Sequence, residues 1–142
     1  MRIIIAAEAL PIVKNKQQIY CKIRHKYVAL TPEESVRQRI VSILSEEYNY
    51  PLTRFSLEAQ ISLGNLSRRY DIVVRDSQQN PFMLIECKAM NVKIDDKVIE
   101  QATSYNVSLK AKYVLLSNLS TTILLRNTEN GYVQQKNIPL LK

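Results

Sequence analysis

The side chains best suited to chemistry lie on two neighbouring expected strands. They occur in the segments Tyr70-Asp71-Ile72-Val73-Val74 and Leu84-Ile85-Glu86-Cys87-Lys88. Because side chains alternate across a strand, Glu86 and Lys88 point to the same face. The polar string over residues 76–81 predicts a turn, and in a hairpin closed by this turn Asp71 comes toward Glu86. Two carboxylates and one ammonium group should therefore converge.

This set of groups suits a hard divalent cation. Asp71 and Glu86 offer oxygen ligands and the backbone carbonyl of Cys87 a third, which leaves room for water and a substrate phosphate. Lys88 would orient the attacking water, lower its pKa or stabilise charge on the phosphoryl oxygens. The alternative is structural: Glu86 and Lys88 form an exposed pair, and Asp71 caps a turn.

The elements that would position these groups alternate between helix and strand. Thr31-Pro32-Glu33-Glu34 combines an N-cap threonine, a proline at the first helical position and a glutamate for a capping box, so a helix of about four turns should begin there. Expected strands at 55–63, 68–75 and 82–88 form a meander, followed by a helix over 95–109 and strands at 112–117 and 122–126. This order predicts an α/β fold with a mixed sheet flanked by helices and a crossover after the second helix.

The N-terminal part of the chain is expected to be an extension. Over residues 19–28, Ile19, Cys21 and Ile23 alternate with polar and basic residues, which predicts one strand. A solvated edge explains the basic face of this strand better than a nucleic-acid contact does. We therefore expect residues 1–30 to be an extension that contains a strand and residues 31–142 to be the main domain, with one compact domain overall.

Composition excludes several functional classes. Gly64 and Gly131 are the two glycines, so no glycine-rich loop can cradle phosphates and no nucleotide cofactor is expected. With His25 as the one histidine, the zinc peptidase HExxH pair is excluded, and two cysteines are too few for a cysteine-ligated zinc site. No apolar run approaches the length of a membrane span and the start lacks a secretory signal, so we expect a cytoplasmic protein without membrane contact.

The charge of the chain favours a polyanion as partner. The formal net charge is +7, and residues 1–30 carry six basic residues against one acidic residue. Lysines and arginines that neutralise phosphates gain free energy from the counterions they release. The alternative explanation is that the charge serves solubility alone.

Four segments resemble a known family. These are Tyr27-Val-Ala-Leu-Thr-Pro-Glu-Glu-Ser-Val-Arg-Gln38, Arg69-Tyr-Asp-Ile-Val-Val74, Ile85-Glu-Cys-Lys-Ala89 and Gln101-Ala-Thr-Ser-Tyr-Asn106. Together they resemble the N-terminal nuclease domain of type I restriction enzyme R subunits, especially its small stand-alone bacterial relatives, within the PD-(D/E)XK nuclease superfamily. The sequence departs from that family at Met90, where proline is common, and at Ser117-Asn118-Leu119, where Thr-Asn-Gly is usual.

The resemblance implies a restriction-endonuclease-like core, with a mixed four-stranded sheet between helices, and Mg²⁺-dependent cleavage of DNA. Asp71 and Glu86 match the metal-binding carboxylates, and Lys88 matches the catalytic lysine. The acidic residue of the first helix falls on Glu33 or Glu34. Helical phase favours Glu33, which shares its face with apolar residues, while Glu34 is assigned to the capping box.

Further residues complete the expected site. Gln101 and Tyr105 match a QxxxY motif of these nucleases, and their spacing stacks them on one helix face toward the lysine, the metal waters or the DNA. Alternatively, Tyr105 is an ordinary core aromatic. Arg68, Arg69 and Lys93 flank the site as expected phosphate contacts, although surface charge explains them equally well.

The leading hypothesis is therefore a Mg²⁺-dependent endonuclease acting on DNA. One alternative is a non-catalytic nucleic-acid-binding or adapter module with the same fold, and another is a relic whose carboxylates serve structure only. Target choice would come from a homodimer, from a partner protein or from DNA structure.

Overall fold

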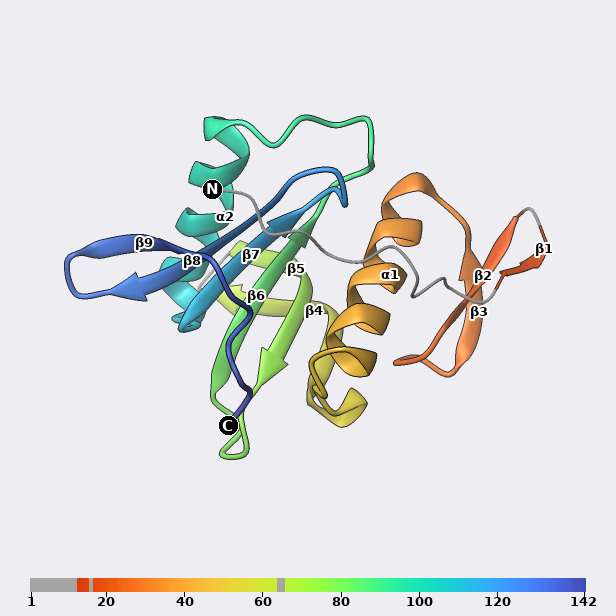
Figure 1. The fold of residues 1–142 in the computed structure, drawn as a ribbon, viewed down its shortest axis with the longest axis horizontal. Helices are drawn as coiled ribbons and strands as arrows, with labels where there is room; N and C mark the ends of the chain where they lie inside the picture. The colour runs from red at the N-terminus through yellow and green to blue at the C-terminus, as the bar shows by residue number, and fades with distance from the viewer. Residues whose placement is uncertain (1–12, 16, 64–65) are drawn as a thin grey trace.

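The computed structural model describes residues 13–15, 17–63 and 66–142, and gives only the backbone for 13–15, 58–63 and 66–68. Over these ranges it has two long helices, α1 (Pro32–Glu46) and α2 (Asp96–Leu109), and a short 3-10 helix, η1 (Leu52–Arg54). Figure 1 shows α1 between a large sheet and a smaller N-terminal one. No helix in the described part of the chain is long and apolar enough to cross a membrane.

The large sheet follows the predicted order. Its neighbouring strands are β4 (Phe55–Leu63), β5 (Leu66–Arg75), β6 (Pro81–Cys87), β7 (Tyr113–Ser117), β8 (Thr122–Thr128) and β9 (Gly131–Gln135). β6 and β7 pair in parallel through the α2 crossover, and all other neighbours are antiparallel. The predicted meander, crossover and mixed sheet flanked by helices are confirmed.

The sheet has six strands in the described residues, and the resemblance implied four. The sequence predicted five of these six strands. The edge strand β9 was not predicted because it lacks a clear apolar face: none of its residues is fully buried, and Val133 is 46% exposed. It is held by pairing with β8, which turns back through Gly131 at a φ of 111°.

Two apolar clusters place the helices on opposite faces of the sheet. Val36, Ile40 and Leu44 of α1 pack with Ile72 and Ile85 on one face. On the other face, Ala102 and Leu109 of α2 pack with Tyr70, Leu84 and Val114. The central strands are thus covered on both sides, which explains their nearly continuous apolar sequences.

The single strand predicted over residues 19–28 is wrong. The chain instead forms β2 (Gln18–Cys21), turns at residues 22–25 and returns as β3 (Lys26–Ala29), and β1 (Val13–Asn15) pairs with β2 on its other side. The turn closes with His25, whose φ is 56° and whose N–H donates to the Cys21 carbonyl at 2.9 Å. Apolar and polar residues continue to alternate across this turn by coincidence, because each of the two short strands that flank it alternates by itself.

The first helix starts where predicted, but Glu34 does only part of what the capping box requires. The Glu34 N–H donates to the Thr31 hydroxyl at 3.0 Å, which caps α1. The Glu34 carboxylate, however, accepts hydrogen bonds from three side chains, those of Arg24, Arg37 and Gln38. The buried Glu34 carboxylate forms these contacts because charged groups in a protein interior need compensating partners.

Candidate active site

The hairpin of β5 and β6 places Asp71 against the strand that carries Glu86. Ile72 pairs with Ile85, so the same register puts Asp71 beside Glu86 as the sequence predicted. The Asp71 Oδ2 atom accepts a hydrogen bond from the backbone N–H of Cys87 at 2.9 Å. Asp71 therefore bridges to the next strand and does not cap a turn.

Glu86 and Lys88 point to the same side of β6, as alternation predicted. Their Oε1 and Nζ atoms are 3.6 Å apart, and both side chains are largely buried. Burial first, and then the negative charge of Asp71, raise the pKa of Glu86 to about 7. Lys88 lowers this pKa, but by less than burial and Asp71 raise it. The two carboxylates thus repel each other in a site with too little positive charge for both.

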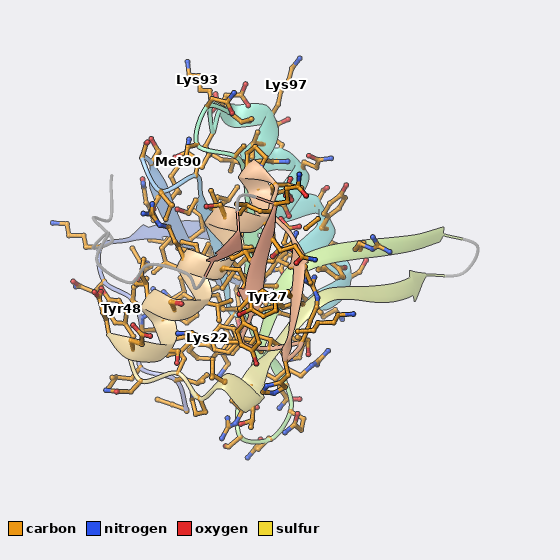
Figure 2. All side chains as sticks on the ribbon, turned by 90° about the vertical axis from the view of Figure 1, so that its right-hand side faces the viewer. Lys22, Tyr27, Tyr48, Met90, Lys93 and Lys97 are labelled. Carbon is orange, nitrogen blue, oxygen red and sulfur yellow. The ribbon has the colours of Figure 1, made fainter. Side chains whose placement is uncertain are left out.

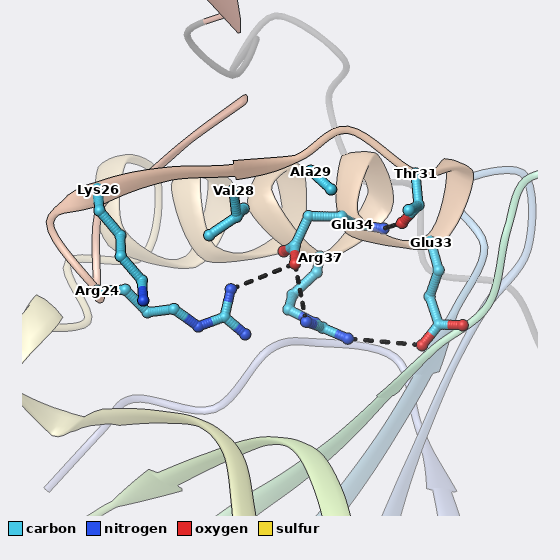
Figure 3. Close-up of a pocket in the computed structure, with 8 residues that line it drawn as sticks. All are labelled: Arg24, Lys26, Val28, Ala29, Thr31, Glu33, Glu34 and Arg37. Atoms are coloured by element: carbon cyan, nitrogen blue, oxygen red, sulfur yellow. Dashed lines mark hydrogen bonds and ion pairs between the residues drawn. The ribbon is translucent and has the colours of Figure 1, made fainter. Parts of the chain in front are cut away.

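The first helix brings Glu33 to the same place. Burial and the Asp71 charge raise the pKa of Glu33, whereas Arg37 and Lys88 lower it. Glu33 thus lies within electrostatic range of both Asp71 and Lys88. In Figure 3 the Glu34 carboxylate instead lies between Arg24 and Arg37, with which it forms ion pairs. The structure therefore favours Glu33 over Glu34 as the helix carboxylate of the site.

Arg37 is the residue of this site that the sequence interpretation missed. Its guanidinium contacts Glu34 Oε1 at 3.0 Å and Glu33 Oε1 at 3.5 Å (Figure 3), and it also contacts Asp71 Oδ1 at 3.4 Å. Only 5% of Arg37 is exposed. The signal in the sequence was an arginine four positions after Glu33, but only the fold shows that it reaches a strand 34 positions away.

The donor set fits a magnesium ion held by few protein ligands. Mg²⁺ commonly takes one or two carboxylates and keeps several waters. Asp71 and Glu86 supply these carboxylates, and each retains lone pairs beyond the contacts already made. In the described residues no group of three or more histidine, cysteine, aspartate or glutamate side chains could hold a metal. Burial raises the pKa of the Cys87 thiol well above its usual range, so only its backbone carbonyl is a candidate ligand.

Gln101 and Tyr105 contact each other on α2. The Gln101 amide donates to the Tyr105 hydroxyl at 3.0 Å. Tyr105 also packs edge-on against Tyr70, with ring centroids 6.2 Å apart, and its backbone carbonyl accepts from the Tyr70 hydroxyl. Tyr105 therefore combines a core role with a place next to the residue that precedes Asp71. Contact with the lysine or with metal waters stays a prediction.

The structure describes the side chains of two of the three expected phosphate contacts. Arg69 is exposed on β5, two positions before Asp71. Lys93 is exposed on the loop after β6, where Figure 2 shows it extending from the body of the protein. The side chain of Arg68 lies outside the described residues. DNA contact by all three stays a prediction.

A turn next to the site replaces the expected Thr-Asn-Gly. The Lys88 N–H donates to the Ser117 carbonyl at 3.0 Å, and the Asn118 amide donates to the Val92 carbonyl at 2.8 Å. Leu119 occupies the following position with a φ of 75°, a conformation that favours glycine. Asn118 thus ties the end of β7 to the loop that follows Lys88, despite the change in sequence.

Comparisons with known proteins agree with the fold. Residues 32–139 match the family described as type I restriction enzyme R protein N terminus. A fragment of a protein assigned as the HsdR subunit of a type I restriction enzyme from Vibrio vulnificus has a similar fold, with a TM-score of 0.57 and 16% sequence identity. The similarity covers 78% of this chain and 24% of that one. No curated protein matches the chain in sequence. The chain belongs to the family of the type I restriction enzyme R protein N terminus.

Proposed function

We propose that this protein is a Mg²⁺-dependent nuclease that cleaves DNA phosphodiester bonds. The observation that carries the proposal is the grouping of Glu33, Asp71, Glu86 and Lys88 at one end of the β5–β6 hairpin. Membership of a restriction enzyme family supports DNA as the substrate.

The chain's own groups would divide the work as follows. Asp71 and Glu86 would hold the ion, with the Cys87 carbonyl as a third ligand. A bound Mg²⁺ supplies a water of lowered pKa and neutralises charge on the phosphoryl oxygens. Lys88 would donate hydrogen bonds to the attacking water or to the phosphate, since its ammonium lies 3.6 Å from Glu86 and remains partly exposed. Glu33 would hold a further water of the site, and Arg37 would fix Asp71.

A plasmid-nicking assay tests this function. We expect the purified protein to nick supercoiled plasmid with Mg²⁺ or Mn²⁺ and to lose this activity in EDTA. Glu86→Ala and Lys88→Ala should lower the rate by at least about a hundredfold, because each removes a group that acts in the transition state. The matched controls are Glu129→Ala and Lys112→Ala, which lie on exposed positions outside the site. Nicking that persists in Glu86→Ala and Lys88→Ala would show that these residues are not its source.

One observation favours a non-catalytic DNA-binding or adapter module as the second candidate. The Arg37 guanidinium lies 3.4 Å from Asp71 and neutralises part of the charge that a cation would need. Such a module would bind DNA with a strong salt dependence, and neither Mg²⁺ nor Lys88→Ala would change its affinity. The same variants in a binding assay therefore separate the two functions.

A further inference from the structure

A hollow of about 490 Å³ lies between the N-terminal hairpin and the first turns of α1 (Figure 3). The hairpin side of the hollow is formed by Arg24, Lys26 and Val28, and the α1 side includes Glu33 and Arg37. Because Arg37 and Glu33 also face Asp71, the hollow adjoins the candidate active site. Its volume is in the range of small-ligand sites, which is enough for a nucleotide unit.

The strand pairing explains why a lysine faces this hollow. Lys26 lies directly opposite Cys21, and Val28 lies opposite Ile19. Residues directly opposite one another share a face of the hairpin, and Ile19 and Cys21 are fully buried. Lys26 is therefore on the same face as the buried residues, at its exposed end. In Figure 3 its side chain extends from the hairpin toward the space beside α1.

The charges around the hollow leave Lys26 as its accessible cation. Lys22 is bound to Glu46 at 2.8 Å, and Arg24 is bound to Glu34 at 3.3 Å. Glu34 is also neutralised by Arg37. For Lys26, which is exposed, the described part of the chain gives no ion-pair partner.

We propose that this hollow binds the DNA backbone next to the scissile phosphate, with Lys26 as the residue that contacts a phosphate. The proposal rests on the nuclease function above and extends its substrate site onto the N-terminal hairpin. Lys26 would act in DNA binding and not in chemistry, since it lies on β3 of the hairpin, whereas Glu86 and Lys88 lie on or directly after β6. Arg24 would hold the hairpin against α1 through its ion pair with Glu34.

The test is DNA binding measured as a function of salt. Fluorescence anisotropy with a labelled duplex of about 20 base pairs in EDTA compares wild type with Lys26→Ala, Lys26→Arg and Lys112→Ala. Lys112 is an exposed lysine just before β7, at the opposite end of the sheet from Lys88. Loss of one phosphate contact lowers the slope of log affinity against log salt by about one. We expect this change in Lys26→Ala only, with Lys26→Arg close to wild type.

The outcomes separate this proposal from the nuclease function. Between 50 and 200 mM salt, wild type should lose about three- to fourfold more affinity than Lys26→Ala. Lys112→Ala should lose as much affinity as wild type over this range and should cleave DNA at the wild-type rate. If wild type cleaves DNA and Lys26→Ala binds as Lys112→Ala does, the hollow is not a phosphate site although the nuclease function stands. If wild type binds DNA with the expected slopes but never cleaves, the nuclease function fails and the hollow stands. If wild type binds no DNA, both fail.

Discussion

At the scale of single residues, the site is organised by one buried arginine. Arg37 contacts carboxylates of both α1 and β5, so it joins the helix to the strand that carries Asp71. An arginine suits this position because its planar guanidinium presents several donors at fixed angles, whereas lysine presents a point charge. The position of Asp71 therefore depends on a residue outside the catalytic set.

Replacing Arg37 should strongly destabilise the protein. Arg37→Ala takes from partly buried Asp71 its arginine partner and leaves buried Glu34 paired with Arg24 alone, and breaking a buried pair costs roughly 3 kcal/mol or more. Urea denaturation followed by circular dichroism measures this loss. The control is Arg39→Ala on the same helix, for which we expect about 0.5 kcal/mol. Equal losses in the two variants would mean that the network does not stabilise the fold.

The raised pKa of Glu86 predicts a pH-dependent stability. The folded protein retains a proton up to about pH 7, whereas a carboxyl with the ordinary pKa of 4.5 loses it earlier in the unfolded chain. Stability from this group is therefore complete below about pH 4 and is lost as the pH rises through 7. Glu86→Gln lacks this loss, so its Tm should approach that of wild type at pH 4.5 and exceed it at pH 8.

Thermal denaturation without divalent ions at these two pH values checks the expectation. Glu129→Gln changes an exposed glutamate, and its Tm should differ from that of wild type by the same small amount at both pH values. A difference between Glu86→Gln and wild type that does not grow with pH would show that Glu86 ionises normally.

At the scale of elements, the residue that ends α2 adopts a backbone conformation that lowers the stability of the protein. Lys110 ends this helix with a φ of 61°, and its N–H donates to the Asn106 carbonyl at 2.7 Å. Glycine is favoured at such a position because it has no Cβ to clash. Lys110→Gly should raise the free energy of unfolding by about 0.5–1 kcal/mol.

A glycine inside the same helix is the matched control. Glu100→Gly at an exposed interior position of α2 should lower the free energy of unfolding by about 1 kcal/mol. Urea denaturation measures both. If Lys110→Gly also destabilised the protein, the left-handed conformation of Lys110 would not be a source of strain.

At the scale of the whole molecule, the N-terminal hairpin works as an additional layer. Nine of the fifteen residues of α1 are buried. A helix covered by a sheet on one side only buries a single stripe of residues, which is fewer. Figure 1 shows β2 and β3 on the side of α1 that faces away from the large sheet. The hairpin itself buries Ile19 and Cys21 completely. We therefore expect residues 1–30 to be integral to a stable domain.

Deleting residues 1–30 should lower the Tm substantially and broaden the transition, because apolar side chains of α1 become exposed to water. By contrast, Lys22→Ala removes only the exposed ion pair with Glu46 and should cost less than 1 kcal/mol. Differential scanning calorimetry compares the two. A truncated chain with an unchanged transition would establish residues 31–142 as an independent domain.

The sequence by itself determined the local elements and one close pairing. The Thr31 cap, the strand β4 and the polar turn at residues 76–81 depend on neighbours in sequence, and all three occur in the structure. The register of a hairpin follows from its turn, so the approach of Asp71 to Glu86 could be counted from the sequence.

Only the tertiary structure decided the rest of the site. Arg37 meets Asp71 across 34 positions, and Lys26 faces the hollow because the chain reverses between Cys21 and Lys26. Helical phase already favoured Glu33 over Glu34, but only the fold shows which side of α1 faces the sheet and which faces the hairpin. These features arise from surfaces that approach each other over long separations, and periodicity along the chain carries no information on such contacts.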